Sequence, residues 1–155
     1  VQVLAGNTGA TAVPLANFFA FEDTLRNGAF VAVGDVTGDG LSDLMFGGGP
    51  GGSPRVRIAD AAQVLAAGNF GSLDNLLPAV VANFFSGPDT NRGGVRVATA
   101  DLDGDAFADL VTGAGDFNGT AVTAYRGSTI ATAAPPPAFF GLDAYPGFAN
   151  GVYVG

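Results

Sequence analysis

Two short acidic segments hold the residues of this 155-residue chain that are best suited to do chemistry. The first, residues 35–43, has the sequence DVTGDGLSD, and the second, residues 101–109, has the sequence DLDGDAFAD. Together they contain half of the 14 acidic residues. Carboxylates this close repel one another unless a cation offsets their charge. The segments are therefore predicted to be cation-binding loops.

Alternate positions of each segment offer oxygen atoms, which are the ligands that calcium prefers. In a calcium loop, positions 1, 3, 5, 7 and 9 surround one point, and position 7 contributes a backbone carbonyl. We expect one calcium site from Asp35, Thr37, Asp39, Leu41 and Asp43. We expect a second calcium site from Asp101, Asp103, Asp105, Phe107 and Asp109. Magnesium tolerates such irregular ligand sets less well.

The segments differ from EF-hands, which need a helix on each side and a Glu at position 12. Position 12 is Phe46 after the first segment and Thr112 after the second, and the flanking residues have strand-like patterns. Gly40 suits the sharp turn at position 6, whereas Ala106 would be strained there. Charge favours the second site and backbone geometry the first, so the two are not ranked. The alternative is a pair of Asx-bonded Asp/Gly turns without metal.

The acidic segments belong to an internal repeat with an offset of 66 residues. The same offset relates residues 17–19 to residues 83–85, which both have the sequence NFF. Each unit contains four short segments that alternate apolar and polar residues and are separated by Gly-, Pro- and Asp-rich turns. We therefore predict an all-β fold of four-stranded antiparallel blade-like repeats, arranged as an incomplete β-propeller or an open blade array.

The repeat divides a single β-repeat domain, residues 1–155, into units. These are a partial unit 1–27, a unit 28–93 with an insertion at about 61–80, a unit 94–150 and a partial strand 151–155. We expect a short helix in the insertion and an extended, Pro-rich connector over residues 128–138. The Phe pairs at 18–19, 84–85 and 139–140 are predicted to pack in the cores between blades.

Composition excludes several classes of function. The net charge of −8 argues against nucleic-acid partners. The chain has no His and no Cys, which removes Ser-His-Asp and Cys-His catalysis, imidazole ligands and disulfides. No apolar run reaches the length of a membrane-spanning helix, so we expect no membrane insertion. We find no convincing nucleophile or general base and predict that the protein is not an enzyme.

Two stretches carry a family resemblance: VAVGDVTGDGLSDLMFGGGPGGSPRVRI (residues 31–58) and VRVATADLDGDAFADLVTGAG (residues 95–115). They resemble FG-GAP repeats of the VCBS type, which are related to the blades of integrin alpha-subunit propellers. The resemblance implies four-stranded blades that bind calcium between strands one and two, at the ten positions named above. It also implies a secreted or cell-surface protein. Thr37 and Ala106 depart from the usual pattern.

We therefore expect an extracellular, calcium-binding structural or adhesive protein that joins copies of itself or adjacent repeats head to tail, as in a filament. One alternative is a propeller segment that binds carbohydrate or protein, and a less favoured one is an accessory domain of a secreted enzyme. Asn118 lies in a glycosylation sequon, and Thr129 and Thr132 precede a Pro-rich stretch, so glycans could be attached at these three residues.

Overall fold

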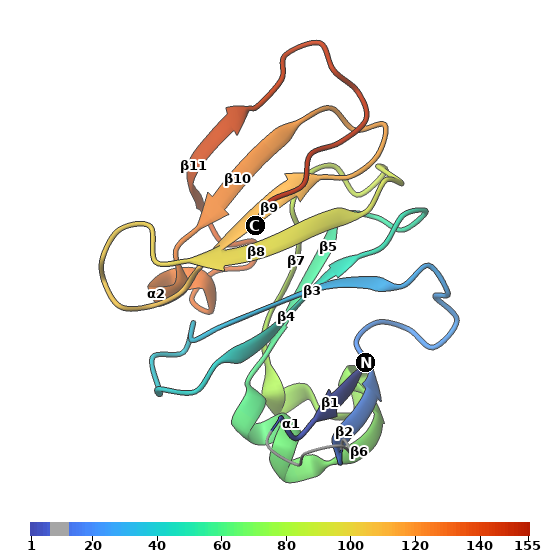
Figure 1. Ribbon diagram of the computed structural model, residues 1–155, viewed down its shortest axis with the longest axis vertical. Helices are drawn as coiled ribbons and strands as arrows, with labels where there is room; N and C mark the ends of the chain where they lie inside the picture. Colours follow the sequence, from blue (N-terminus) through green and yellow to red (C-terminus); the bar gives the residue numbers. More distant parts are fainter. Residues whose placement is uncertain (7–12) are drawn as a thin grey trace.

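Three β-sheets lie side by side in the computed structural model, which describes residues 1–6 and 13–155 (Figure 1). The first sheet has the order β1-β2-β6 and consists of β1 (Gln2–Leu4), β2 (Pro14–Phe19) and β6 (Asn69–Ser72). The middle sheet has the order β3-β4-β5-β7 and consists of β3 (Ala29–Gly34), β4 (Asp43–Gly48), β5 (Arg55–Ala59) and β7 (Val80–Phe85). The last sheet has the order β11-β10-β9-β8 and consists of β8 (Val95–Ala100), β9 (Asp109–Ala114), β10 (Ala121–Tyr125) and β11 (Ala138–Asp143).

The middle and last sheets confirm the prediction of four-stranded antiparallel blades. In each sheet the four strands pair in the order in which the chain forms them, apart from β6 of the insertion, which belongs to the first sheet. Every pairing within the two sheets is antiparallel. The two sheets match at the 66-residue offset, because the pairing of Gly34 with Asp43 recurs as the pairing of Ala100 with Asp109. The sheets form an open array, in which the acidic segments connect the first two strands of each blade.

The insertion contains the expected helix and a strand that we did not expect. Helix α1 (Ala61–Ala67) is capped at its start by Asp60, whose side chain accepts a hydrogen bond from the Gln63 amide. Beyond it, β6 pairs in parallel with β2, and the Phe70 ring stacks on Phe18 at a centroid distance of 4.8 Å. Two short 3₁₀ helices, η1 (Leu73–Asn75) and η2 (Leu77–Ala79), then lead into β7. The insertion thus adds a third strand to the first sheet.

The C-terminal third departs from the expected local structure at two places. The expected extended connector instead begins within a short helix, α2 (Gly127–Ile130), and runs extended only near β11. Residues 151–155 are not assigned as a strand, although the Val152 amide donates to the Ala114 carbonyl at 3.0 Å. The final segment therefore lies against β9, but it forms too few backbone hydrogen bonds with β9 to be a regular strand.

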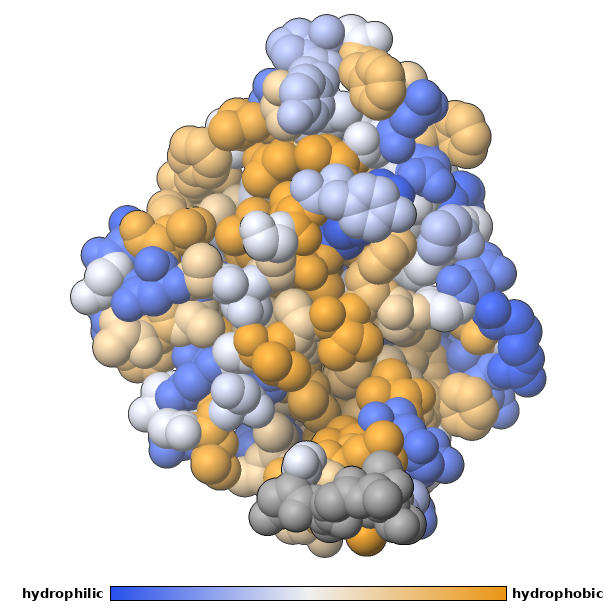
Figure 2. Space-filling view, in the orientation of Figure 1, coloured by the Kyte–Doolittle hydropathy of each residue, from blue (hydrophilic) through white to orange (hydrophobic). Residues whose placement is uncertain are grey.

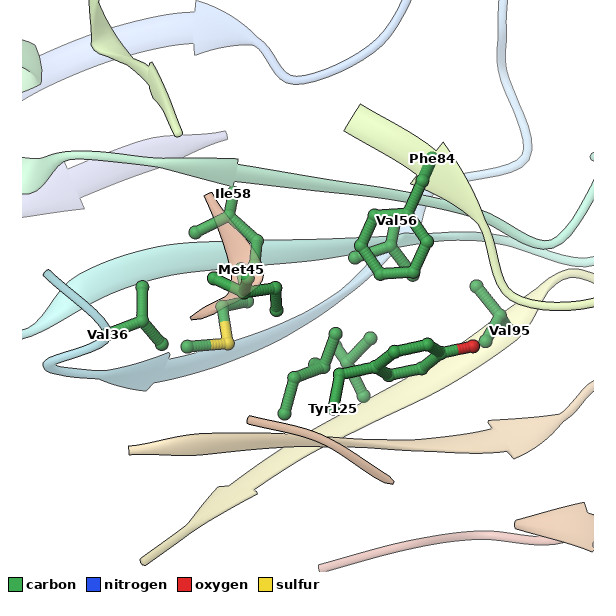
Figure 3. Close-up of a cluster of buried hydrophobic side chains, with 10 residues drawn as sticks. Val36, Met45, Val56, Ile58, Phe84, Val95 and Tyr125 are labelled. Carbon is green, nitrogen blue, oxygen red and sulfur yellow. The ribbon is translucent and has the colours of Figure 1, made fainter. Parts of the chain in front are cut away.

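The blades pack through two hydrophobic clusters. One lies between the first and middle sheets and includes Phe18, Phe46 and Leu73. The other lies between the middle and last sheets (Figure 3), and its members are Val36, Met45, Val56, Ile58, Phe84, Val95, Val97, Leu110, Tyr125 and Ile130. Burial of these apolar side chains stabilises the packing of adjacent blades against each other.

The prediction that the Phe pairs pack in the cores between blades holds for one ring of the pair, in two of the three units. Phe18 and Phe84 are buried, but Phe19, Phe85 and Phe140 are 46%, 44% and 48% exposed. Adjacent residues of a strand point to opposite faces, so one ring of each pair must leave the face on which the other packs. In the last unit the Arg126 guanidinium lies over the Phe139 ring, with its Cζ atom 4.8 Å from the ring centroid.

The innermost strands approach each other closely at glycines. A Cβ atom on Gly47 would collide with the Val95 carbonyl oxygen, and one on Gly113 would lie 2.5 Å from the Val152 carbonyl oxygen. The C-terminal segment thus lies against β9 much as β8 lies against β4. Side chains beside these contacts stack: the Arg96 guanidinium lies 5.6 Å from the Phe30 ring centroid and 4.2 Å from that of Tyr153.

Candidate metal centre

The second acidic loop, between β8 and β9, brings three of its four carboxylates together. One ligand atom each from Asp101, Asp103 and Asp109 lies within 4.8 Å of the others. Within residues 1–6 and 13–155, this is the one group of three or more potential metal-ligating side chains that converges in this way. Asp105 is outside the group. Three convergent carboxylates are a donor set that a hard cation such as calcium accepts.

Backbone amides hold the start of this loop in shape. The Asp101 carboxylate accepts hydrogen bonds from Gly104 at 2.7 Å and from Ala106 at 3.2 Å, and Asp105 accepts one from Phe107 at 3.0 Å. Ala106 has a φ of 70°, which is the strain expected where the first loop has glycine. The hydroxyl of Ser128 and then the Phe107 amide lower the pKa of the exposed Asp105.

Asp109 connects this loop to the element that follows β10. Its side chain is fully buried, with Oδ2 accepting from the Leu102 amide and Oδ1 from the Gly127 amide, each at 2.9 Å. Gly127 is the first residue of α2. Each carboxylate oxygen has two lone pairs, so one lone pair on each remains for a cation.

The first loop, between β3 and β4, has the same backbone bonds at its start. The Asp35 carboxylate accepts from the amides of Gly38, Asp39 and Gly40 at 2.6, 3.2 and 2.8 Å. Slight desolvation alone would raise the pKa of Asp35, but these three amides lower it. Asp39 in turn accepts from the Leu41 amide at 2.8 Å. These are the bonds of Asx-type turns, so they accommodate both the metal-bound and the metal-free interpretation.

Asp43 repeats the role of Asp109 in the first loop. It is fully buried, with Oδ2 accepting from Val36 and Thr37 at 3.1 and 3.0 Å, and Oδ1 from Ala61 at 3.3 Å. Ala61 is the first residue of α1. Burial raises the pKa of Asp43 above its ordinary value, although these amides act in the opposite direction.

The two loops differ at position 3. The first loop has Thr37 where the second has Asp103, and the Thr37 hydroxyl lies 3.5 Å from Asp35 Oδ1. Asp35, Asp39 and Asp43, all within the described residues, do not form a convergent carboxylate group. The structure therefore assembles the stronger donor set in the second loop, which the sequence did not rank.

A family model for the FG-GAP repeat matches residues 93–129, which include β8, the second loop, β9 and β10. Residues 93–129 thus resemble an FG-GAP repeat. No curated protein and no solved structure matched the chain. FG-GAP repeats form propeller-like blades and are typical of extracellular proteins. No helix in the described part of the chain has the length and apolar character needed to cross a bilayer.

The three expected glycosylation sites lie in or near this FG-GAP repeat and differ in exposure. The Asn118 side-chain nitrogen, to which a glycan would be attached, is buried and has no hydrogen-bond partner. Thr129 and Thr132 are exposed, although the Thr132 hydroxyl donates to the Thr129 carbonyl at 2.7 Å. The fold thus leaves only the two threonines accessible.

Sequence reasoning missed two features of the FG-GAP repeat. Arg126 Nε donates to Asp103 Oδ2 at 2.7 Å, so a guanidinium already contacts a predicted ligand. Asp109 also connects the acidic loop to Gly127, which is 18 residues away in the chain. The 66-residue offset relates Asp109 to Asp43 and Gly127 to Ala61, so it accounts for the recurrence of this contact in both blades but could not have indicated the contact itself.

Proposed function

We propose that this protein is an extracellular, non-catalytic structural or adhesive protein whose propeller-like blades are stabilised by calcium. The observation that carries the proposal is the convergence of Asp101, Asp103 and Asp109 in the second acidic loop. The donor atoms are all carboxylate oxygens, and one of the three groups is buried and already oriented by two amides. These properties fit a hard divalent cation better than a soft transition metal.

Calcium bound there would offset the repulsion among the three carboxylates. Since Asp109 also accepts from the first residue of α2, the ion would fix the β8–β9 connection relative to the end of β10. We propose a second, weaker calcium site in the first loop, with Asp35, Thr37, Asp39, Asp43 and the Leu41 carbonyl as its ligands. Its lower affinity follows from the missing carboxylate at Thr37.

Thermal unfolding in calcium and in chelator tests this proposal. A ligand at 100 times its dissociation constant stabilises the folded state by about 2.7 kcal/mol per site. For a domain of this size, that corresponds to a rise in melting temperature of roughly 5–11 °C. The double variant D101N/D103N should lose most of the rise, while Asp89→Asn, an exposed control between β7 and β8, should keep it. An equal melting temperature in calcium and chelator would refute the calcium proposal.

We also propose that copies of the chain pack head to tail, with a further repeat covering β3. Val31 and Val33 on β3 are 52% and 54% exposed. Val97, which occupies the place of Val31 in the next blade, is only 7% exposed because it packs beside Gly47 on β4. Hydrophobic side chains gather over this part of the molecule (Figure 2). The apolar face of β3 therefore resembles a blade interface that has not been formed.

Mass measurement at micromolar concentration tests the assembly. We expect species larger than a monomer in calcium, and their loss in the double variant V31T/V33T, which keeps the β-branched shape but adds hydroxyl groups. The variant should unfold at nearly the same temperature as the original chain. A monomer at all concentrations, with calcium bound, would contradict the assembly and leave the calcium proposal intact.

A groove beside the insertion favours carbohydrate binding as the second candidate function. It has a volume of about 410 Å³ and is lined by Phe19, Glu22, Asp23, Gly71, Ser72, Asp74 and Asn75. An exposed aromatic ring with nearby carboxylate, amide and hydroxyl groups is a combination that can bind a sugar ring. A glycan array with Phe19→Ala as the comparison tests it: binding lost in the variant would favour a lectin-like role.

A further inference from the structure

The residue before each short helix has the same backbone position relative to its acidic loop in both blades. In the last blade it is Arg126, which precedes Gly127, the amide donor to Asp109. In the middle blade it is Asp60, which precedes Ala61, the amide donor to Asp43. Both positions are thus one residue from a group bonded to the last aspartate of the loop. They carry opposite charges.

Arg126 contacts one carboxylate of the second loop. Its Nε atom donates to Asp103 Oδ2 at 2.7 Å, and the two side chains are 49% and 23% exposed. The guanidinium also lies over the Phe139 ring. The loop with the best donor set therefore already has a cation on one of its three convergent ligands.

Asp60 carries the opposite charge one residue before the amide that bonds to Asp43. Its carboxylate accepts from the Gln63 amide at 3.2 Å and from Gln63 Nε2 at 2.8 Å, and neither of these donors carries a charge. The negative charge at the start of α1 is therefore not offset by its hydrogen-bond partners. The next residue, Ala61, donates its amide to Asp43, so this charge stands one residue from a bond to a proposed ligand.

We propose that Arg126 acts as an internal counter-cation that sets the calcium affinity of the second loop, and that Asp60 has the opposite effect on the first. The inference rests on the proposed calcium sites. A divalent ion at Asp101, Asp103 and Asp109 would share the Asp103 carboxylate with Arg126, and it would be repelled by the guanidinium. Phe139 offers the released guanidinium an alternative contact. The two loops are thereby brought closer in affinity than their carboxylates alone would make them.

Calorimetric titration with calcium chloride tests the proposal on two matched charge changes. Arg126→Gln, made in a chain whose first loop is inactivated by Asp35→Asn, should bind calcium roughly three- to fivefold more tightly, as expected for removal of a partly exposed charge. Asp60→Asn, made in a chain whose second loop is inactivated by Asp101→Asn, should bind more weakly by a similar factor. Asparagine caps helices as well as aspartate does, so α1 should be retained. Arg92→Gln, on the loop before β8, is the control and should change neither affinity.

Salt and spectroscopy distinguish a counter-cation from a merely structural residue. The effect of Arg126→Gln should shrink as ionic strength rises. In the original chain, calcium should shift the Arg126 Nε–H resonance, because its bond to Asp103 is altered. Weaker or unchanged calcium binding by Arg126→Gln would overturn the inference, since Arg126 would then be positioning Asp103 or be irrelevant to the site. If neither inactivated chain takes up calcium, both the inference and the proposed function fail.

Discussion

Replacing Asp109 by asparagine tests whether the last carboxylate of the loop supports the fold independently of metal. The side chain is fully buried and accepts one backbone amide on each oxygen, from Leu102 and Gly127. Asparagine keeps the shape and one acceptor oxygen, but its NH₂ group faces one of the two amides and cannot accept. One charge-assisted hydrogen bond is therefore lost.

A hydrogen bond to a charged group contributes about 1.5–3 kcal/mol, so we expect Asp109→Asn to lower the free energy of unfolding by about 2 kcal/mol. For a chain of this length the melting temperature should fall by roughly 4–8 °C. Urea unfolding in chelator measures this cost with calcium removed. Asp105→Asn, which changes an exposed carboxylate of the same loop, is the control and should leave the melting temperature nearly unchanged.

Amide hydrogen exchange supplies a second measurement at single residues. The amides of Leu102 and Gly127 should exchange faster in Asp109→Asn, whereas amides in the middle of β4 should not change. If the variant is as stable as the original chain in chelator, the connection between the loop and α2 contributes nothing by itself. Asp109 would then serve only a bound cation, and our account of its burial would be wrong.

Three further predictions concern the first loop, the contact between blades and a buried tyrosine. Thr37→Asp should add the missing carboxylate and raise the calcium affinity of the first loop about tenfold, as measured by calorimetry. Gly47→Ala should lower stability to urea by roughly 1–3 kcal/mol, because the new methyl collides with a backbone carbonyl. Gly6→Ala, whose methyl would meet no atom of the described residues within 4 Å, should be neutral. Burial raises the pKa of Tyr125 above 10.0, although its bond to Ser86 acts in the opposite direction, so ionisation favours the unfolded chain. Stability should therefore be retained below about pH 10 and fall at higher pH, with Tyr125→Phe weakening this alkaline loss and the phenolate absorbance reporting ionisation.

The repeat made the blades predictable, because turn residues and alternation agree in two copies at a fixed offset. The insertion was harder to predict. Its helix follows a sequence pattern, but β6 is short and contains Gly71, and it forms a strand because β2 offers an edge and Phe18 a ring for Phe70. Tertiary contact there outweighs weak local preference.

The sequence identified the candidate metal-binding residues as a set, but it did not predict how their side chains are arranged in space. Spacing indicated which side chains face one point, yet Asp105 lies outside the convergent group while Asp103 lies inside it. The Phe pairs show the same limit, since sequence periodicity could not say that Phe19 and Phe85 lie on the exposed side of their strands. The bond between Arg126 and Asp103 depends on where β10 ends relative to the loop, which only the folded chain determines.

The close contact at Gly47 has a consequence for how such an array can diversify. Because the next inner strand meets this glycine through its own backbone carbonyl, the contact demands little of the side chains on the approaching strand. Phe30, Arg96 and Tyr153 occupy corresponding places on successive inner segments, and they form a matched stack in which a guanidinium lies against two aromatic rings. A blade that presents a backbone carbonyl at this glycine can therefore approach its predecessor closely, while the stacked side chains beside the contact set which blades fit together.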